Sequence, residues 1–177
     1  MARNIEIKAP LADLAAARAV VVRLGALAHA VEEQTDRYFT LDGEHRVKLR
    51  TIGGGRAELI DYRRGEHAGV RASEYTVSPV RHDGLCAVPK GDPIVVVRKR
   101  REILLWDNVR IHLDTVERLG TFLELEAVVD AQHDEAACRE QVAAVLAALA
   151  IGEVDLIRAS YAELLLARSL GAVGRPR

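Results

Sequence analysis

The chain has 177 residues, of which 49% are hydrophobic and 29% are charged, and this composition is typical of a folded globular protein rather than of a disordered or fibrous one. Its formal net charge of −1 provides no basic field for a nucleic acid polymer, and its two cysteines, Cys86 and Cys138, are too few for a disulfide framework or a zinc site of four thiolates. Because neither an apolar signal core nor a run of membrane-spanning length is present, we expect a cytoplasmic protein that binds no membrane and whose thiols are reduced. We expect a single domain over residues 1–170 and a flexible tail over residues 171–177.

A strand and then a helix are expected first. Residues 3–8 read "RNIEIK", in which two isoleucines alternate with Asn4, Glu6 and Lys8, and this two-residue period is that of a strand with one apolar and one polar face. After Pro10, the segment "LADLAAARAVVVRLGA" is rich in Ala, Leu and Arg and predicts a helix.

A series of short strands follows from Thr35. The segments "TDRYFTL", "EHRVKLRTI", "GRAELIDYRR", "RASEYTV", "DPIVVVRKRREILLW", "NVRIHLDTV" and "TFLELEAVV" are separated by Gly, Pro, Asp or Asn, which is typical of an antiparallel meander or barrel. Residues 81–93 form a turn-rich connection within this series. After Asp130 the segments "EAACREQVAAVLAALA" and "VDLIRASYAELLLARSL" predict two helices, so the order of elements indicates an α+β fold.

The polar faces of these strands are dense in charge, and the sign of the charge differs from strand to strand. The alternating polar positions are Arg46, Lys48 and Arg50, then Lys99 and Arg101, then Arg110, His112 and Asp114, and finally Glu124 and Glu126. A sheet with one face in water would explain any single strand. Like charges two positions apart repel each other, however, and three helices could cover the outside of a curled sheet. We therefore expect the charged face to point inward, which is costly unless a charged ligand fills the interior.

A polyphosphate with a divalent metal ion satisfies basic and acidic walls together. Arg and Lys donors neutralise phosphate oxygens, and carboxylates on alternate positions of one strand can hold Mg²⁺ or Mn²⁺ against the same phosphates. Zinc fits less well because the acidic cluster offers oxygen ligands and a single nearby histidine, His112, for which we favour a hydrogen-bonded role over metal ligation.

The ordered set of motifs resembles the CYTH superfamily, the triphosphate tunnel metalloenzymes that include class IV adenylyl cyclases and thiamine triphosphatases. The motifs are "NIEIK", "DRYF", "VKLR", "AELIDYRR", "RASEY", "KRR", "RIHLD" and "LGTFLELE", and they extend from residue 3 to about residue 129. The resemblance implies a closed antiparallel β-barrel of about eight strands, with helices packed outside and a tunnel lined by charge.

The resemblance also implies roles for individual residues. The family signature Glu-x-Glu-x-Lys is matched by Glu6 and Lys8, while Asn4 stands in place of its first glutamate. The residues that resemble the triphosphate-binding set are Lys8, Lys48, Arg50, Lys99 and Arg101. Those that resemble the metal site are Glu6, Asp114, Glu124 and Glu126.

Tyr38 resembles a tyrosine that, in the triphosphatases, is paired with a lysine to activate water. The candidate catalytic residues are therefore Tyr38, Lys8 and Arg64. The strand that often carries a tunnel lysine in the family has none here, and the guanidinium of Arg64 cannot accept a proton. Asn4 retains an oxygen ligand but loses a charge, which should weaken metal binding or restrict it to one ion.

Three functions are consistent with this set of residues. The first is a metal-dependent triphosphatase, the second is a class IV adenylyl cyclase in which a ribose hydroxyl attacks the α-phosphorus, and the third is a non-catalytic module that binds a triphosphate or nucleotide. We predict an enzyme that acts on a small-molecule triphosphate and leave the cleaved bond open. The oligomeric state is also open, with a homodimer as one option.

Overall fold

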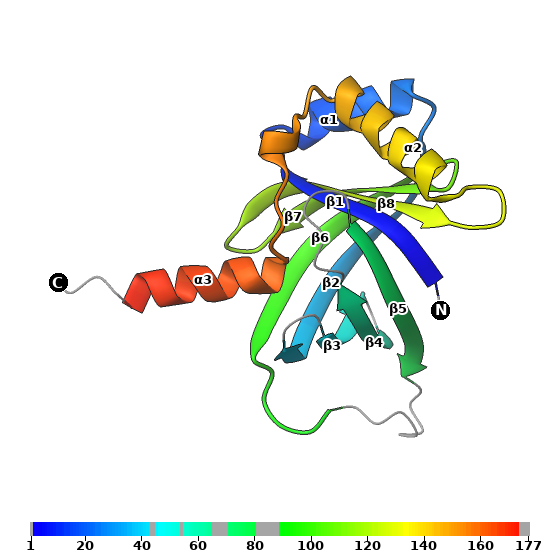
Figure 1. Ribbon diagram of the computed structural model, residues 1–177. Helices are drawn as coiled ribbons and strands as arrows, with labels where there is room; N and C mark the ends of the chain where they lie inside the picture. Colours follow the sequence, from blue (N-terminus) through cyan, green and yellow to red (C-terminus); the bar gives the residue numbers. More distant parts are fainter. Residues whose placement is uncertain (1, 43–44, 54, 65–70, 81–88, 174–177) are drawn as a thin grey trace.

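The computed structural model describes residues 2–42, 45–53, 55–64, 71–80 and 89–173. These described residues form eight strands, three α-helices and one short 3-10 turn (Figure 1). The elements are β1 (Ala2–Pro10), α1 (Leu14–Arg23), β2 (Leu27–Asp42), β3 (His45–Ile52), β4 (Arg56–Arg64), β5 (Arg71–Val80), β6 (Val95–Trp106), β7 (Val109–Val116), β8 (Gly120–Val129), α2 (Glu135–Ala148), the 3-10 turn Glu153–Asp155 and α3 (Tyr161–Val173). The prediction of an α+β fold with eight antiparallel strands is confirmed.

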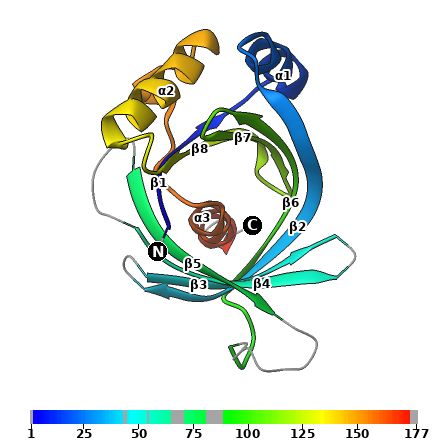
Figure 2. The same cartoon turned by 90° about the vertical axis from the view of Figure 1, so that its right-hand side faces the viewer.

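The strands form one strongly curled sheet, which Figure 2 shows end-on. Neighbouring strands are antiparallel in the order β1-β5-β4-β3-β2-β6-β7-β8. β1 pairs with β8 from Arg3 to Pro10 and with β5 from Ala2 to Glu6, so the first strand has a partner on each side. Side chains at alternate positions of every strand therefore point toward the inside of the curl.

The outer face of β1, β7 and β8 carries the main hydrophobic core. Ile5, Leu113 and Leu125 are at most 2% exposed and pack with Val21 of α1 and Val142 of α2. Figure 2 shows both helices on the same side of the sheet, above β1 and β8. Because this face is apolar and covered, the charged residues between these positions are turned to the interior.

Each of the two covering helices begins at an aspartate that caps its first turn. A side-chain oxygen of Asp13 accepts a hydrogen bond from the backbone amide of Ala16 at 2.9 Å, and Asp134 accepts one from Ala137 at 2.8 Å. These caps satisfy amides that have no partner within the helix, and each typically contributes ~1 kcal/mol. The two capping residues lie where the spacing of apolar residues in the sequence changes from the period of a strand to that of a helix.

The third helix differs from the expectation that the helices pack outside the sheet. Its first residues, Tyr161 and Ala162, are at most 5% exposed, while Leu170 is 75% exposed. In Figure 1 α3 leads away from the sheet, and in the end-on view of Figure 2 it lies within the ring of strands. The helix therefore closes one end of the curl with its N-terminal turn, because Tyr161 and Leu165 pack with apolar residues of the inner face there.

The ends of the predicted segments also differ in detail. α3 continues to Val173, three residues beyond the expected domain boundary, and residues 174–177 lie outside the described part. Residues 81–88 of the turn-rich connection, with Cys86, lie outside it as well. Cys138 is a free, buried thiol. Among the described residues, no helix is long and apolar enough to cross a membrane.

Truncation of Leu125 to alanine should destabilise the fold strongly. The side chain is 0% exposed and lies in the core between β8 and the two covering helices. Removing it leaves a cavity, and we expect the free energy of unfolding to fall by about 2–5 kcal/mol in urea titrations. The matched control is Leu170→Ala on the exposed part of α3, which should stay within about 0.5 kcal/mol of the wild type. Equal losses in both variants would contradict this placement of the core.

Candidate active site

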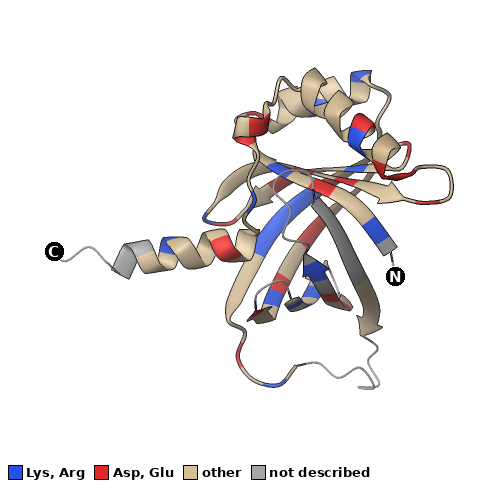
Figure 3. Cartoon of the chain, viewed as in Figure 1, with Lys and Arg blue, Asp and Glu red and all other residues tan. Residues whose placement is uncertain are grey.

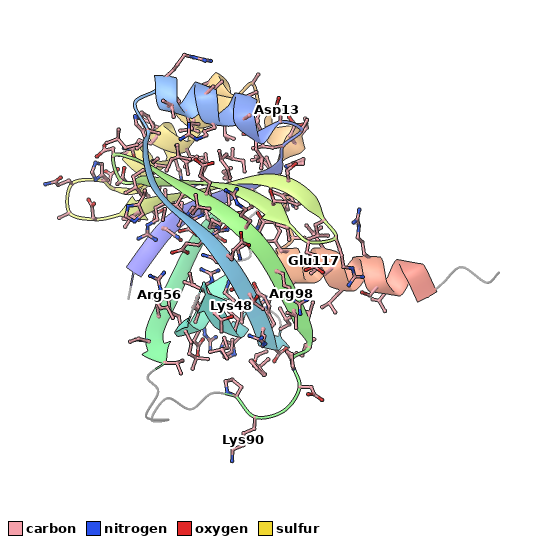
Figure 4. All side chains as sticks on the ribbon, turned by 180° about the vertical axis from the view of Figure 1, so that it is seen from behind. Asp13, Lys48, Arg56, Lys90, Arg98 and Glu117 are labelled. Carbon is pink, nitrogen blue, oxygen red and sulfur yellow. The ribbon has the colours of Figure 1, made fainter. Side chains whose placement is uncertain are left out.

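A cavity of about 360 Å³ lies inside the curled sheet, and every strand contributes to its wall. Its basic residues are Lys8, Lys48, Arg50, Lys99, Arg101 and Arg110, and its acidic residues are Glu6, Asp36, Glu58, Glu124 and Glu126. In Figure 3 positions of both signs follow the strands, and the side chain of Lys48 lies within the curl in the view of Figure 4. The structure therefore brings together, around one cavity, the five residues predicted to bind triphosphate.

Asp36 on β2 is the centre of the basic part of this cavity. One of its oxygens, Oδ2, accepts hydrogen bonds from Nζ of Lys48 and Nζ of Lys99, each at 2.9 Å. Arg50 donates to both carboxylate oxygens, at 2.7 and 2.9 Å. Three cations thus share one carboxylate that is 0% exposed, which leaves this part of the cavity with an excess of positive charge.

Burial and charge act against each other on these groups. Burial alone would raise the pKa of Asp36, but Arg50, Lys48 and Lys99 hold it well below its usual value, so the carboxylate is ionised. Burial lowers the pKa of Lys99 to about 7, and the charges of Arg50, Arg101 and Lys48 add to this effect, while Asp36 opposes it. Lys99 is therefore an ammonium group that can lose its proton close to neutral pH.

Arg101 links the basic part of the cavity to the acidic part. It donates to both oxygens of Asp114, at 2.7 and 2.6 Å, and to Glu124 at 3.1 Å. Tyr161 of α3 donates its hydroxyl proton to the same Asp114 at 2.8 Å. Since both oxygens of Asp114 are already bonded and the residue is 0% exposed, it holds Arg101 and α3 in position.

A group of three residues next to Arg101 could hold a metal ion. The ligand atoms of His112, Glu124 and Glu126 lie within 4.8 Å of one another. Nδ1 of His112 is buried without a hydrogen-bond partner among the described residues and lies 3.9 Å from Glu126. Burial and the charge of Arg101 lower the pKa of His112 to about 3, so the neutral ring can offer a lone pair. The sequence favours a hydrogen-bonded role for His112, but among the described residues Nδ1 has no hydrogen-bond partner.

The two glutamates of this group differ in their electrostatic surroundings. Burial would raise the pKa of Glu124, but Lys8 and Arg101 hold it well below its usual value. The pKa of Glu126 is raised by burial and by the nearby charges of Glu124 and Glu6. Such repulsion between carboxylates is relieved by a bound cation, so this donor set fits a divalent ion.

β1 brings the signature residues to the same wall. In its register Glu6 is opposite Glu126, and Lys8 is opposite Glu124 with a separation of 3.7 Å between Nζ and Oε2. Asn4, at 3% exposure, also lines the cavity, and its Oδ1 has no hydrogen-bond partner among the described residues. The position that departs from the family signature therefore still offers an oxygen to this cavity.

Tyr38 has a lysine partner, although from a strand other than the one expected. Nζ of Lys48 on β3 lies 3.4 Å from the hydroxyl of Tyr38, within hydrogen-bond distance. Arg64 ends β4, and its side chain lies outside the described part of the structure. The tyrosine–lysine contact that the sequence left in doubt is thus formed by Tyr38 and Lys48.

The closed end of the cavity is formed by residues of α3 that the sequence did not indicate. The ammonium of Lys8 lies 4.4 Å from the ring centroid of Tyr161, and this ring packs on Phe122 at 5.1 Å. Glu163 pairs with Arg46 of β3 at 2.7 Å and accepts hydrogen bonds from Ser160. These contacts attach the first turn of α3 to the inner wall.

Asp36 is the main residue that the interpretation of the sequence missed. It alternates with Tyr38 in "TDRYF", so its strand period already placed it on the inner face. Its role depends on cations from β3 and β6, which the sequence does not place beside it. No sequence pattern could have indicated Tyr161, because it lies in a helix whose packing is set by the whole fold.

Removal of the charge of Asp36 should destabilise the free protein. In Asp36→Asn three buried cations lose their shared anion, and we expect about 3–5 kcal/mol less free energy of unfolding in urea titrations. Asp92→Asn, an exposed aspartate before β6, is the matched control and should change stability by less than about 0.5 kcal/mol. An Asp36→Asn variant as stable as the control would show that the cations do not depend on this carboxylate.

Known proteins resemble this chain in sequence and in fold. A protein of Methanocaldococcus jannaschii named "Putative adenylate cyclase MJ0240" is 38% identical over 68 residues, which cover 38% of this chain and 39% of that protein. Among solved structures, the PH1012 protein of Pyrococcus horikoshii aligns with a TM-score of 0.77 at 24% identity, covering 91% of this chain and 98% of that one.

A second structural relative is HpAC1 of Hippeastrum, described as an adenylyl cyclase candidate with a dominant triphosphatase activity. It aligns with a TM-score of 0.62 at 13% identity and covers 96% of each chain. At these identities the two structures support the fold alone. The family profile described as "CYTH domain" matches residues 2–161, nearly the whole chain. The protein therefore belongs to the CYTH family.

Proposed function

We propose that the protein is a divalent-metal-dependent enzyme that acts on a small-molecule triphosphate held inside the curled sheet. The observation that carries this proposal is the set of six basic residues around one interior cavity, of which Lys8, Lys48, Lys99 and Arg101 are at most 8% exposed. Such a concentration of buried positive charge is costly for the free protein and is compensated when a polyanion binds. The sheet would then act as a closed tunnel, and the pairing of β1 with both β5 and β8 supports this view.

The uneven distribution of charge in the cavity supports binding of the phosphates at its basic part, around Asp36. Around Asp36 three cations share one carboxylate, whereas Arg101 contacts two carboxylates, those of Asp114 and Glu124. Phosphate oxygens would therefore bind beside Lys48, Arg50 and Lys99, and bidentate contacts from Arg50 suit them. Binding requires these donors to turn partly from Asp36 to the ligand.

The acidic side of the same cavity would hold Mg²⁺ or Mn²⁺. The candidate ligands are His112, Glu124 and Glu126, with Glu6 opposite Glu126. Nearby on β1 lies Oδ1 of Asn4, which has no hydrogen-bond partner in the described part of the chain. Asp114, predicted as a fourth ligand, is engaged by Arg101 and Tyr161 and would act by positioning them. A divalent ion bound here would supply charge neutralisation for the phosphates.

Two reactions fit this arrangement, and relatives with names of both kinds occur. In a triphosphatase the pair of Tyr38 and Lys48 would orient the attacking water, and in an adenylyl cyclase a ribose hydroxyl would attack the α-phosphorus. The specific observation that favours a non-catalytic module is Asn4, which provides a neutral oxygen where the family signature has a carboxylate. We propose the enzyme, located in the cytoplasm, and keep the binding module as the second candidate.

Product analysis tests the proposal directly. The purified protein is incubated with Mg²⁺ or Mn²⁺ and with ATP, GTP, thiamine triphosphate or inorganic tripolyphosphate, and the products are separated by chromatography and identified by mass spectrometry. Cyclic nucleotide with pyrophosphate would identify a cyclase, and free phosphate with a diphosphate would identify a triphosphatase. Metal-dependent binding without turnover would favour the module, and neither binding nor turnover would refute both candidates.

The matched variant for this experiment is Glu126→Gln. It preserves size but removes a metal-ligand charge, so we expect metal-dependent turnover at limiting Mg²⁺ to fall at least about tenfold, while the free energy of unfolding changes by less than about 1 kcal/mol. Glu117→Gln, at an exposed position in the turn after β7, is the control and should keep full activity. Full activity of Glu126→Gln at limiting Mg²⁺ would exclude this glutamate from the metal site.

Triphosphate affinity should decrease as the pH rises through about 7. Lys99 has its pKa lowered to about 7 by burial, and a polyanion binds best to the protonated form, so deprotonation above this pH weakens binding by up to about tenfold per pH unit. The dissociation constant of tripolyphosphate is measured by calorimetry from pH 6 to pH 8.5. Lys99→Arg, whose guanidinium stays charged, should have a flatter profile, and identical slopes would show that Lys99 is not the titrating group.

A further inference from the structure

The first residue of α3 interacts with cations from two strands. Tyr161 is 5% exposed and lines the cavity inside the curled sheet. Its ring centroid lies 4.4 Å from Nζ of Lys8 on β1 and 5.8 Å from Nζ of Lys99 on β6. Its hydroxyl donates to Asp114, which holds Arg101. One side chain from a helix therefore reaches two of the predicted phosphate-binding residues and the partner of a third.

The ring stabilises these ammonium groups in a way that differs from an ion pair. Nζ of Lys99 donates to Asp36 at 2.9 Å, so a phosphate must take this donor from the carboxylate. The face of an aromatic ring attracts a cation through its quadrupole at distances up to about 6 Å and does not require one of its N–H donors. The ring of Tyr161 can therefore hold Lys8 and Lys99 beside a ligand while their N–H groups point to phosphate oxygens.

The sequence at the start of α3 fixes the place of this ring. Residues 160–163 read "SYAE", which is the pattern of a capping box. Oγ of Ser160 accepts a hydrogen bond from the backbone amide of Glu163 at 3.2 Å, and Oε2 of Glu163 accepts one from the backbone amide of Ser160 at 2.7 Å. Glu163 also pairs with Arg46 of β3 at 2.7 Å. Tyr161 therefore enters the cavity from a backbone that is held on both sides of it.

The hydroxyl of Tyr161 acts on a third cation through Asp114. Oδ2 of Asp114 accepts a hydrogen bond from this hydroxyl at 2.8 Å and one from Nη2 of Arg101 at 2.6 Å, while Oδ1 accepts one from Nε of Arg101 at 2.7 Å. The two bonds from Arg101 fix the plane of its guanidinium, and the bond from Tyr161 fixes the carboxylate in turn. The hydroxyl therefore orients Arg101 without contacting it.

We propose that Tyr161 is a positioning residue of the triphosphate site. Its ring holds Lys8 and Lys99 in place, and its hydroxyl holds Arg101 through Asp114. The inference rests on the proposed function, in which a triphosphate binds to these cations. It adds the first turn of α3 to a site that is otherwise built from strands.

Two variants separate the ring from the hydroxyl. The ligand is methylene-bridged tripolyphosphate, which has no P–O–P bond to hydrolyse, titrated by calorimetry with Mg²⁺ at pH 6.5. Tyr161→Phe keeps the ring and should bind about fivefold more weakly than the wild type, because Asp114 loses a donor. Tyr161→Leu loses the ring as well and should bind at least about twentyfold more weakly. Wild-type affinity in Tyr161→Phe would overturn the role of the hydroxyl even if Tyr161→Leu does not fold, and equal affinities of the two variants would overturn the role of the ring.

A control on the same helix separates positioning from stability. Leu165, 4% exposed, packs in the same apolar cluster one turn after Tyr161. Leu165→Ala should lower the urea midpoint of unfolding at least as much as Tyr161→Leu but bind the ligand within about threefold of the wild type. An equally weak affinity in Leu165→Ala would show that Tyr161 acts only through stability and would overturn the proposal.

The pH dependence of binding provides a readout that a merely structural residue would not change. In the wild type the affinity should begin to fall near pH 7, where Lys99 loses its proton. Because the ring favours the charged form of this ammonium, the fall should begin at lower pH in Tyr161→Leu and stay in place in Leu165→Ala. Equal profiles of all three proteins would overturn the contact with Lys99. Failure of the wild-type protein to bind the ligand at any pH would overturn the proposed function itself, and the inference with it.

Discussion

The shared carboxylate of Asp36 makes the interior of this protein possible. Lys48, Arg50 and Lys99 point into one cavity from two strands, and without an internal anion their mutual repulsion would oppose the closing of the sheet. One carboxylate can hold three cations without neutralising them. The protein therefore keeps an excess of positive charge in a place that water reaches poorly, which suits the anionic ligand proposed above.

This interior depends on the separation of the two faces of each strand. On β8, Leu123 and Leu125 pack against helices while Glu124 and Glu126 face inward, so one strand serves both the hydrophobic core and the cavity. The covering helices provide the burial that stabilises the fold. Because the apolar contacts lie outside the curl, its interior can be specialised for charge.

Along the axis of the curl the environment changes in three stages. An aromatic cluster with Tyr161 closes one end, cations around Asp36 fill the middle, and charged residues mixed with a few aliphatic ones such as Ile103 line the other end. Arg101, bonded to Asp114 and Glu124, stands at the boundary between the basic and the acidic part of the interior.

The sequence by itself determined the strands, their two faces and most of the charged residues, because alternation with a period of two assigns each side chain to a face wherever the strand lies. It therefore predicted Lys48, Lys99 and Glu126 as residues of one interior. Only the tertiary structure decided which charges meet: Asp36 lies among cations of β3 and β6, and Asp114 is bonded on both oxygens. Strand pairing and the packing of α3 determine these contacts, and they depend on the register between distant segments, which local periodicity does not contain.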